Sequence, residues 1–155
     1  MPVRVLIVDD HEVVREGVQN IINKARPEWE ICGEAANGQE AIDAAKRLKP
    51  DIILLDITMP RMSGLEAASQ ISRLGLPGKI LIFTMHESGE LAGDARRVGA
   101  KGYVRKSEAA RHLVLAIETL LAGGTFFGRP EKAQRDPEGN PGSGIILRLA
   151  LSFSF

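Results

Sequence analysis

Residues 3–10 of the chain, VRVLIVDD, decide the fold: a segment with branched apolar side chains on both faces ends in two adjacent carboxylates, Asp9 and Asp10. Residues 51–56, DIILLD, repeat this arrangement and end in Asp56. A strand that is apolar on both faces is typical of a parallel sheet covered by helices on both sides. The two segments therefore predict central strands of such a sheet.

Strand patterns alternate with helical patterns along the first 124 residues. The candidate strands are residues 3–8, 30–35, 51–55, 79–84 and 102–104, and the candidate helices are residues 12–25, 39–48, 65–74, 90–98 and 108–122. This alternation predicts an α/β domain with a parallel sheet. Ser63 and Glu66 have the spacing of a capping box for the third helix, and Ser107 is the candidate cap of the fifth.

The predicted strands carry charged side chains to one edge of the sheet. The carboxyl ends of parallel strands meet at one crevice, which would gather Asp9, Asp10, Asp56 and Lys106. Clustered carboxylates repel and raise one another's pKa unless a cation joins them, and a divalent metal ion is the natural one. An aspartate nucleophile, a hard metal ion and a lysine suffice for transfer of a phosphoryl group to a carboxylate.

Each of these residues has an ordinary structural explanation when it is taken singly. Asp9 or Asp10 suits the N-cap of a helix, Asp56 suits a loop, and a lysine such as Lys106 usually lies on the surface. Their joint placement at one edge favours a site, to which Thr84 adds a hydroxyl. The three histidines lack the mutual spacing of metal ligands, which argues against a zinc centre.

The composition sets wide limits on function. The 155 residues suffice for one domain with a core, and 20 basic against 20 acidic side chains leave no electrostatic footprint for nucleic acid or membrane. A lone cysteine, Cys32, makes no internal disulfide and is predicted to be a buried thiol. No apolar segment has the length needed to span a bilayer. We expect a soluble cytoplasmic protein.

The composition changes after Gly124, so we divide the chain into a domain at residues 1–124 and a tail at residues 125–155. Residues 125–144 contain four glycines and three prolines, which is typical of a linker that buries little. Residues 145–155, IILRLALSFSF, alternate as a strand does. They are expected to pair with an edge of the sheet or with a second copy, unless they form a disordered remnant.

Four segments resemble the receiver domain of bacterial two-component response regulators: VLIVDDHEVVREG at 5–17, DIILLDITMPRMSGLEA at 51–67, ILIFTMHE at 80–87 and GAKGYVRKS at 99–107. The resemblance covers about residues 1–124. The pieces TMHE and AGGTFF are most similar to the NarL/FixJ class, which normally joins a receiver to a helix-turn-helix DNA-binding domain. The resemblance implies a flavodoxin-like fold with five parallel strands in the order 2-1-3-4-5.

The same resemblance implies a role for each strand-end residue. Asp56 would be the phosphoacceptor, Asp10 and Asp56 would bind Mg²⁺ directly, Asp9 would act mainly through water, and the backbone carbonyl of Thr58 would complete the protein ligands. Such a sparse oxygen set suits Mg²⁺, which keeps several waters.

A second group of residues would couple phosphorylation to a change in the conformation of the domain. The resemblance implies that Lys106 pairs first with Asp56 and then with the phosphoryl oxygens. Thr84 would be the switch hydroxyl, and Tyr103 the aromatic side chain that swings inward behind it. The added charge then biases a conformational equilibrium.

The chain departs from the family pattern at several positions. Ser107 follows Lys106 where many receivers have proline, so the sequence does not call for a cis peptide bond there and leaves the isomer open. Met85 is bulkier than the usual residue and would restrict access to the site. A DNA-binding domain of this class needs about 60 residues, whereas residues 125–155 number 31 and show no such pattern. We therefore expect no direct DNA binding by this chain.

The expected function is that of a phosphorylation-controlled binding module rather than an enzyme with a separate substrate. Its partners would be a sensor histidine kinase and an unidentified downstream protein, and a homodimer is a further expectation. Three alternatives are a transcriptional regulator that lacks its DNA-binding domain, a phosphohydrolase of the haloacid dehalogenase kind, and a nucleotide-binding Rossmann-type domain. The last is disfavoured because DDHE, not a glycine turn, follows the first strand.

Overall fold

The computed structural model describes residues 2–85 and 89–127. Five parallel strands form one sheet in the order β2-β1-β3-β4-β5. The strands are β1 (Arg4–Val8), β2 (Glu30–Ala35), β3 (Ile52–Leu55), β4 (Lys79–Thr84) and β5 (Gly102–Arg105). The flavodoxin-like fold and the strand order implied by the resemblance are confirmed.

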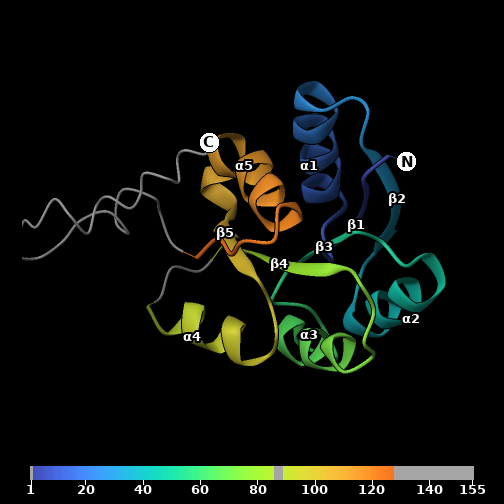
Figure 1. The fold of residues 1–155 in the computed structure, drawn as a ribbon. Coiled ribbons are helices and arrows are strands. Elements are labelled where there is room, and N and C mark those ends of the chain that lie inside the picture. The colour runs from blue at the N-terminus through green and yellow to red at the C-terminus, as the bar shows by residue number, and fades with distance from the viewer. Residues whose placement is uncertain (1, 86–88, 128–155) are drawn as a thin grey trace, which may run out of the picture.

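Helices cover both faces of the sheet (Figure 1). They are α1 (Glu12–Ala25), α2 (Gly38–Leu48), α3 (Gly64–Ser72), α4 (Gly89–Arg97) and α5 (Ala109–Leu121), with a short 3₁₀ turn, η1 (Lys106–Glu108), before the last. One apolar core joins the sheet to α1 and α5, and a second joins it to α2, α3 and α4. No helix among residues 2–85 and 89–127 is long and apolar enough to cross a membrane.

The two cores explain why the central strands are apolar throughout. In β1, Val5 and Ile7 contribute to the core beneath α1 and α5, while Leu6 and Val8 contribute to the opposite core. Successive side chains of a strand point to opposite faces, so a strand covered on both sides needs apolar residues at every position. The edge strand β2 is less completely covered, and Cys32 is partly exposed, contrary to the prediction of a buried thiol. Burial still raises the pKa of the Cys32 thiol.

The helix starts agree with the sequence predictions at α3 and differ at α5. The hydroxyl of Ser63 accepts a hydrogen bond from the Glu66 amide (3.2 Å), as an N-cap does. The prediction that Ser107 caps the fifth helix is wrong. Ser107 lies inside η1, and the residue before α5 is Glu108, which makes no side-chain cap. The 3₁₀ turn takes Glu108, which the sequence pattern assigned to the helix, so α5 begins at Ala109.

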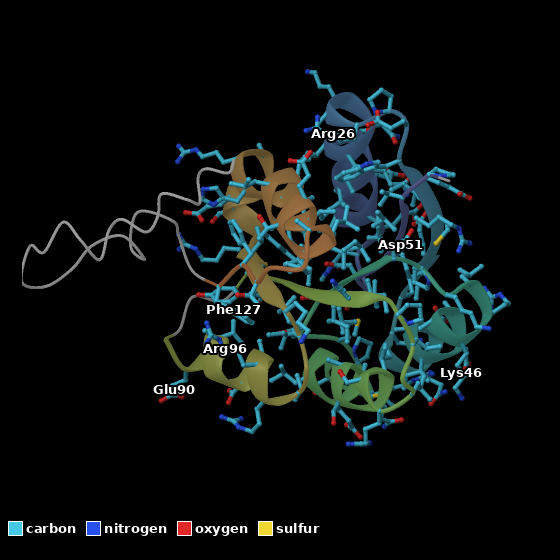
Figure 2. The ribbon with its side chains drawn as sticks, viewed as in Figure 1. Arg26, Lys46, Asp51, Glu90, Arg96 and Phe127 are labelled. Carbon is cyan, nitrogen blue, oxygen red and sulfur yellow. The ribbon has the colours of Figure 1, made fainter. Side chains whose placement is uncertain are left out.

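Phe126 pairs with the free edge of β5, although the sequence predicted a linker that buries little from residue 125 onward. The Tyr103 amide donates to the carbonyl of Phe126 (2.8 Å), and the Phe126 amide donates to the carbonyl of Lys101 (2.9 Å). The guanidinium carbon of Arg96 lies over the ring of Phe127, 4.2 Å from the ring centre (Figure 2). The rest of the predicted tail, including IILRLALSFSF, lies outside the described residues.

Candidate functional site

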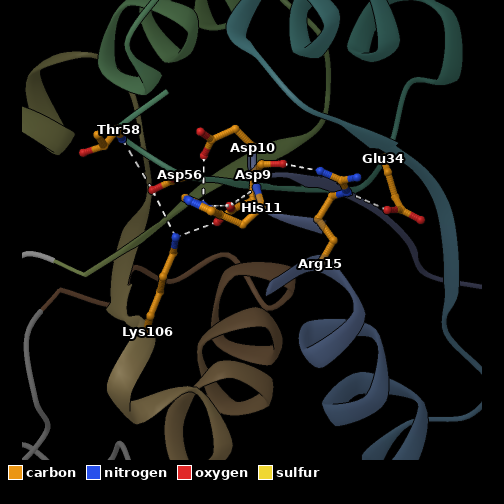
Figure 3. A network of polar contacts seen from close by, with 8 residues as sticks. All are labelled: Asp9, Asp10, His11, Arg15, Glu34, Asp56, Thr58 and Lys106. Atoms are coloured by element: carbon orange, nitrogen blue, oxygen red, sulfur yellow. Dashed lines mark hydrogen bonds and ion pairs between the residues drawn. The ribbon is translucent and has the colours of Figure 1, made fainter. Parts of the chain in front are cut away.

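The site lies at the carboxyl edge of the sheet (Figure 3), where Asp9 follows β1, Asp56 follows β3 and Lys106 follows β5. The ammonium nitrogen of Lys106 lies 2.6 Å from Oδ2 of Asp9 and 3.4 Å from Oδ1 of Asp56. The lysine thus contacts both acids, and its closer partner is Asp9 rather than Asp56, the partner that the resemblance implied. The convergence of the strand ends is present, and it brings together residues almost 100 positions apart in sequence.

The charges in this cluster are buried and do not balance. Asp9 is 1% exposed and Asp56 is 3% exposed, while the Lys106 side chain is 13% exposed. Burial, followed by the negative charge of Asp9, raises the pKa of the Asp56 carboxyl, and the Lys106 charge opposes this rise. Two carboxylates therefore share one lysine, and the pocket favours a further cation.

Asp10 extends the cluster toward solvent, with 27% of its side chain exposed. The ring nitrogen Nδ1 of His11 lies 3.1 Å from Oδ1 of Asp9 and 3.1 Å from Oδ1 of Asp10. One ligand atom from each of these three residues falls within a 4.8 Å group that could hold a metal ion. The sequence argument gave His11 no part in the site because it compared the histidines only with each other, whereas the informative feature was its place beside Asp10.

The acid cluster fits a divalent cation that prefers oxygen ligands. Oδ2 of Asp9 and Oδ1 of Asp10 are buried, and among the described residues neither accepts a hydrogen bond. Oδ2 of Asp9 contacts the ammonium of Lys106, and Oδ1 of Asp10 contacts the ring of His11. Buried carboxylate oxygens without donors are costly unless a cation meets them, and carboxylate oxygens are the ligands that Mg²⁺ takes.

The remaining residues that the resemblance named are distributed around this cluster. The amide of Thr58, an exposed residue, lies 3.4 Å from Oδ1 of Asp56. Thr84 is fully buried at the end of β4 and is in register with Arg105, the residue before Lys106. Tyr103 is partly buried and packs against the core beneath α2, α3 and α4.

Two positions that depart from the family pattern are described by the structure. The described residues contain no cis peptide bond, so the bond after Lys106, whose isomer the sequence left open, is trans. Met85 is an exposed side chain, and its expected effect on access to the site stays a prediction.

Gly64 is a site residue that the sequence argument missed. A Cβ atom at this position would lie 1.9 Å from the backbone oxygen of Asp56, so only a glycine lets the start of α3 approach the Asp56 loop so closely. The Gly64 amide also donates to the carbonyl of Ile57 (2.7 Å). The sequence shows a glycine directly after the capping serine, Ser63, and the cap analysis used only the serine.

Comparison with known proteins identifies the family. Residues 5–118 match the model of the response regulator receiver domain. The chain belongs to this family. The receiver domain is a signalling domain, and this agrees with the sequence interpretation. Neither a haloacid dehalogenase phosphohydrolase nor a Rossmann-type nucleotide-binding domain is needed to explain the fold or the site.

Relatives and solved structures agree with this assignment. The receiver is 38% identical over 122 residues to the nitrate/nitrite response regulator protein NarL of Escherichia coli (strain K12), covering 79% of this chain and 56% of that protein. A LuxR-family two-component response regulator from Aurantimonas sp. SI85-9A1 superposes with a TM-score of 0.79 at 40% identity, covering 89% of this chain and 97% of that one. The receiver domain of a NarL from Mycobacterium tuberculosis has a TM-score of 0.73 at 31% identity, over 79% and 98% of the two chains.

The chain spans about half the length of the curated relatives it matches.

Proposed function

We propose that this receiver accepts one phosphoryl group on Asp56 from the phosphohistidine of a sensor histidine kinase, with Mg²⁺ present, and then changes shape to control a partner protein. The observation that carries the proposal is the buried Asp56 carboxylate at the end of β3, which shares Lys106 with Asp9. A carboxylate held in this way is poorly solvated and therefore available as a nucleophile.

The proposed transfer breaks one bond and forms one. A carboxylate oxygen of Asp56 attacks the phosphorus of the donor, a bond from oxygen to phosphorus forms, and the bond from phosphorus to the donor's histidine nitrogen breaks. The histidine leaves with the electron pair. Lys106, whose Nζ is 3.4 Å from the Asp56 carboxylate, is close enough to pair with oxygens of the arriving phosphoryl group.

The proposed metal ligands are the carboxylates of Asp10 and Asp56 and the backbone carbonyl of Thr58, with Asp9 acting through water. The buried carboxylate oxygens of Asp9 and Asp10 that accept no hydrogen bond within the described residues support this assignment. Mg²⁺ held by these residues would supply positive charge that offsets the acid cluster and the phosphoryl oxygens. The residues of this chain orient the nucleophile and exclude water from the buried side of the pocket.

Thr84 and Tyr103 are the proposed switch residues. Thr84 is buried at the end of β4, next to the β5 position that precedes Lys106, and Tyr103 lies two residues earlier on β5. A hydroxyl drawn toward a phosphoryl oxygen would leave space beneath it, which an aromatic side chain on the neighbouring strand can enter. The proposal includes neither direct DNA binding nor turnover of a separate substrate by the receiver. It leaves a homodimer as a further expectation.

The test is phosphorylation by acetyl phosphate, a small-molecule donor, with and without Mg²⁺, followed by intact mass measurement. The wild-type chain should gain one acid-labile phosphoryl group only with the divalent ion. Asp56→Asn should gain none, whereas Asp51→Asn, a matched control at the other end of the same strand, should behave as wild type. A phosphoryl increment that persists in Asp56→Asn would show that another residue is the acceptor.

A further inference from the structure

Arg15, on the side of Asp9 opposite Lys106, connects three elements at the edge of the site (Figure 3). From α1, its Nη1 donates to the backbone carbonyl of Asp9 (2.5 Å), and its Nε donates to a carboxylate oxygen of Glu34 on β2 (2.7 Å). The Arg15 side chain is 16% exposed, so these bonds are partly shielded from water. The guanidinium thus occupies a defined position between the acid turn and β2.

The partners of Arg15 are themselves held in place. The second carboxylate oxygen of Glu34 accepts from the side-chain amide of Gln19, one helical turn further along α1 (2.8 Å). The amide of Asp9 donates to the carbonyl of Ala35, the residue after Glu34 (3.0 Å). The peptide units before and after Asp9 are therefore both anchored, one to the β2 backbone and the other to Arg15.

The anchored carbonyl matters for Asp10. The carbonyl of Asp9 and the Cα of Asp10 belong to one planar peptide unit, so a fixed carbonyl direction also fixes the position of the Asp10 Cα, from which the side chain extends. Apart from the contact with His11, no hydrogen bond or ion pair to another side chain within residues 2–85 and 89–127 holds the Asp10 carboxylate. Its backbone is thus the main restraint on where its oxygens lie.

We propose that Arg15 is a positioning residue: it holds the Asp9–Asp10 peptide so that the Asp10 carboxylate is preset to bind a divalent cation. This inference rests on the proposed function, because it concerns the metal site of the phosphotransfer. Arginine suits the task, since its planar group offers several donors in a rigid arrangement and can bind two acceptors in different directions.

If Arg15 acts by positioning the peptide, its removal should change the affinity for a divalent cation in one direction. If it acts only through its charge, the change should be in the opposite direction. Arg15 carries a positive charge beside the acid cluster. If only its charge mattered, removing Arg15 should tighten the binding of a divalent cation, because the two positive charges repel. Loss of the peptide anchor should instead weaken binding, because Asp10 must then be ordered when the ion binds. A residue that only stabilised the fold would leave the affinity of the folded protein unchanged.

The experiment is a calorimetric titration of the full chain with Mg²⁺. Arg15→Gln should bind the ion about 10-fold more weakly, the size of effect expected when a residue that orients a metal ligand is removed. Arg26→Gln is the matched control, because Arg26 also lies next to α1 and pairs with an acidic residue, Glu118 on α5, but at the helix end far from the site. Its affinity should equal that of wild type.

Two further variants and a second readout define the mechanism. Arg15→Lys restores the charge and one donor group, so its affinity should lie between those of wild type and Arg15→Gln. It also tests the proposal if the glutamine variant does not fold. In phosphorylation by acetyl phosphate, the Mg²⁺ concentration at half-maximal rate should rise about 10-fold in Arg15→Gln, while the rate at saturating Mg²⁺ stays near wild type.

Equal or tighter Mg²⁺ binding by Arg15→Gln, with wild-type binding intact, would overturn the inference and leave the proposed function standing. A lower phosphorylation rate at saturating Mg²⁺ with unchanged affinity would overturn it as well. A wild-type chain that bound no Mg²⁺ and took no phosphoryl group would instead overturn the proposed function, and the inference with it.

Discussion

Two aspartates border β3, and the fold treats them differently. Asp51, just before the strand, is exposed (Figure 2), and one of its oxygens accepts from the Arg4 amide (2.8 Å). Asp56, just after the strand, is buried beside Asp9 and shares one lysine with it. At the amino edge of the sheet, the carboxylate of Asp51 is solvated and supports the start of β1. At the carboxyl edge, the carboxylate of Asp56 is buried next to a second carboxylate, which disfavours its charged form.

The ion pairs at the two edges differ in the same way. At the amino edge, Arg4 lies 3.6 Å from an oxygen of Glu30, and both side chains are substantially exposed to water. At the carboxyl edge, the contact between Lys106 and Asp9 is almost fully buried. Exposed pairs contribute little to stability, while a buried charge without its partner is strongly destabilising. The comparison suggests that the carboxyl edge is built for chemistry at the expense of stability.

The largest effect is expected for Lys106→Met. It leaves Asp9 and Asp56 buried without their shared cation, so the free energy of unfolding at neutral pH should fall by about 3 kcal/mol. The loss should shrink on acidification, because protonation of one carboxyl removes the repulsion. Urea denaturation at several pH values measures both.

Lys79→Met at the start of β4 is the control for this variant. Lys79 donates to the carbonyl of Leu120 (3.1 Å), which does not titrate. The cost should be about 1 kcal/mol and should not vary with pH between about 4 and 8. If Lys106→Met and Lys79→Met lost equal amounts of unfolding free energy at every pH, the two edges of the sheet would not differ in the cost of their buried charges.

A smaller effect of opposite sign is expected for Asp56→Asn. This variant leaves one buried anion, Asp9, with one buried cation, Lys106, and should be more stable than wild type by roughly 1 kcal/mol at neutral pH without metal. The pKa of Asp56 is raised in the folded state, so ionisation of this group lowers the stability of wild type as pH rises from the ordinary value of 3.8 through the folded value.

The advantage of Asp56→Asn should therefore disappear below the ordinary pKa of 3.8, where the carboxyl is protonated in both states. Unfolding free energies measured across this pH range give the result, with Asp51→Asn expected to stay within about 0.5 kcal/mol of wild type. If Asp56→Asn were less stable than wild type at neutral pH, the charged carboxylate of Asp56 would stabilise the fold, contrary to this prediction.

The smallest effect is expected for Glu30→Gln at the amino edge. Its contact with Arg4 is exposed, so the loss should be below about 0.5 kcal/mol in dilute buffer and should vanish in about 1 M salt. Thermal unfolding at two salt concentrations tests this. A loss comparable to that of Lys106→Met would show that exposure does not separate the two edges.

The sequence by itself determined the elements and their order. Short strand patterns marked β2 and β4 at their observed bounds, β4 as an apolar run, and the helical pattern did the same for α1. These patterns are local, so neighbouring residues suffice to specify them. The positions of Asp9, Asp56 and Lys106 at strand ends followed from the same patterns, because parallel strands bring their carboxyl ends to one edge.

Only the tertiary structure decided the environment of these residues. The burial of Asp56, the closer pairing of Lys106 with Asp9, and the contact from Arg15 to Glu34 join residues far apart in sequence. The packing of Phe126 on β5 likewise depends on an edge that β4 leaves free. Desolvation and charge pairing are properties of the assembled elements, so no local pattern specifies them.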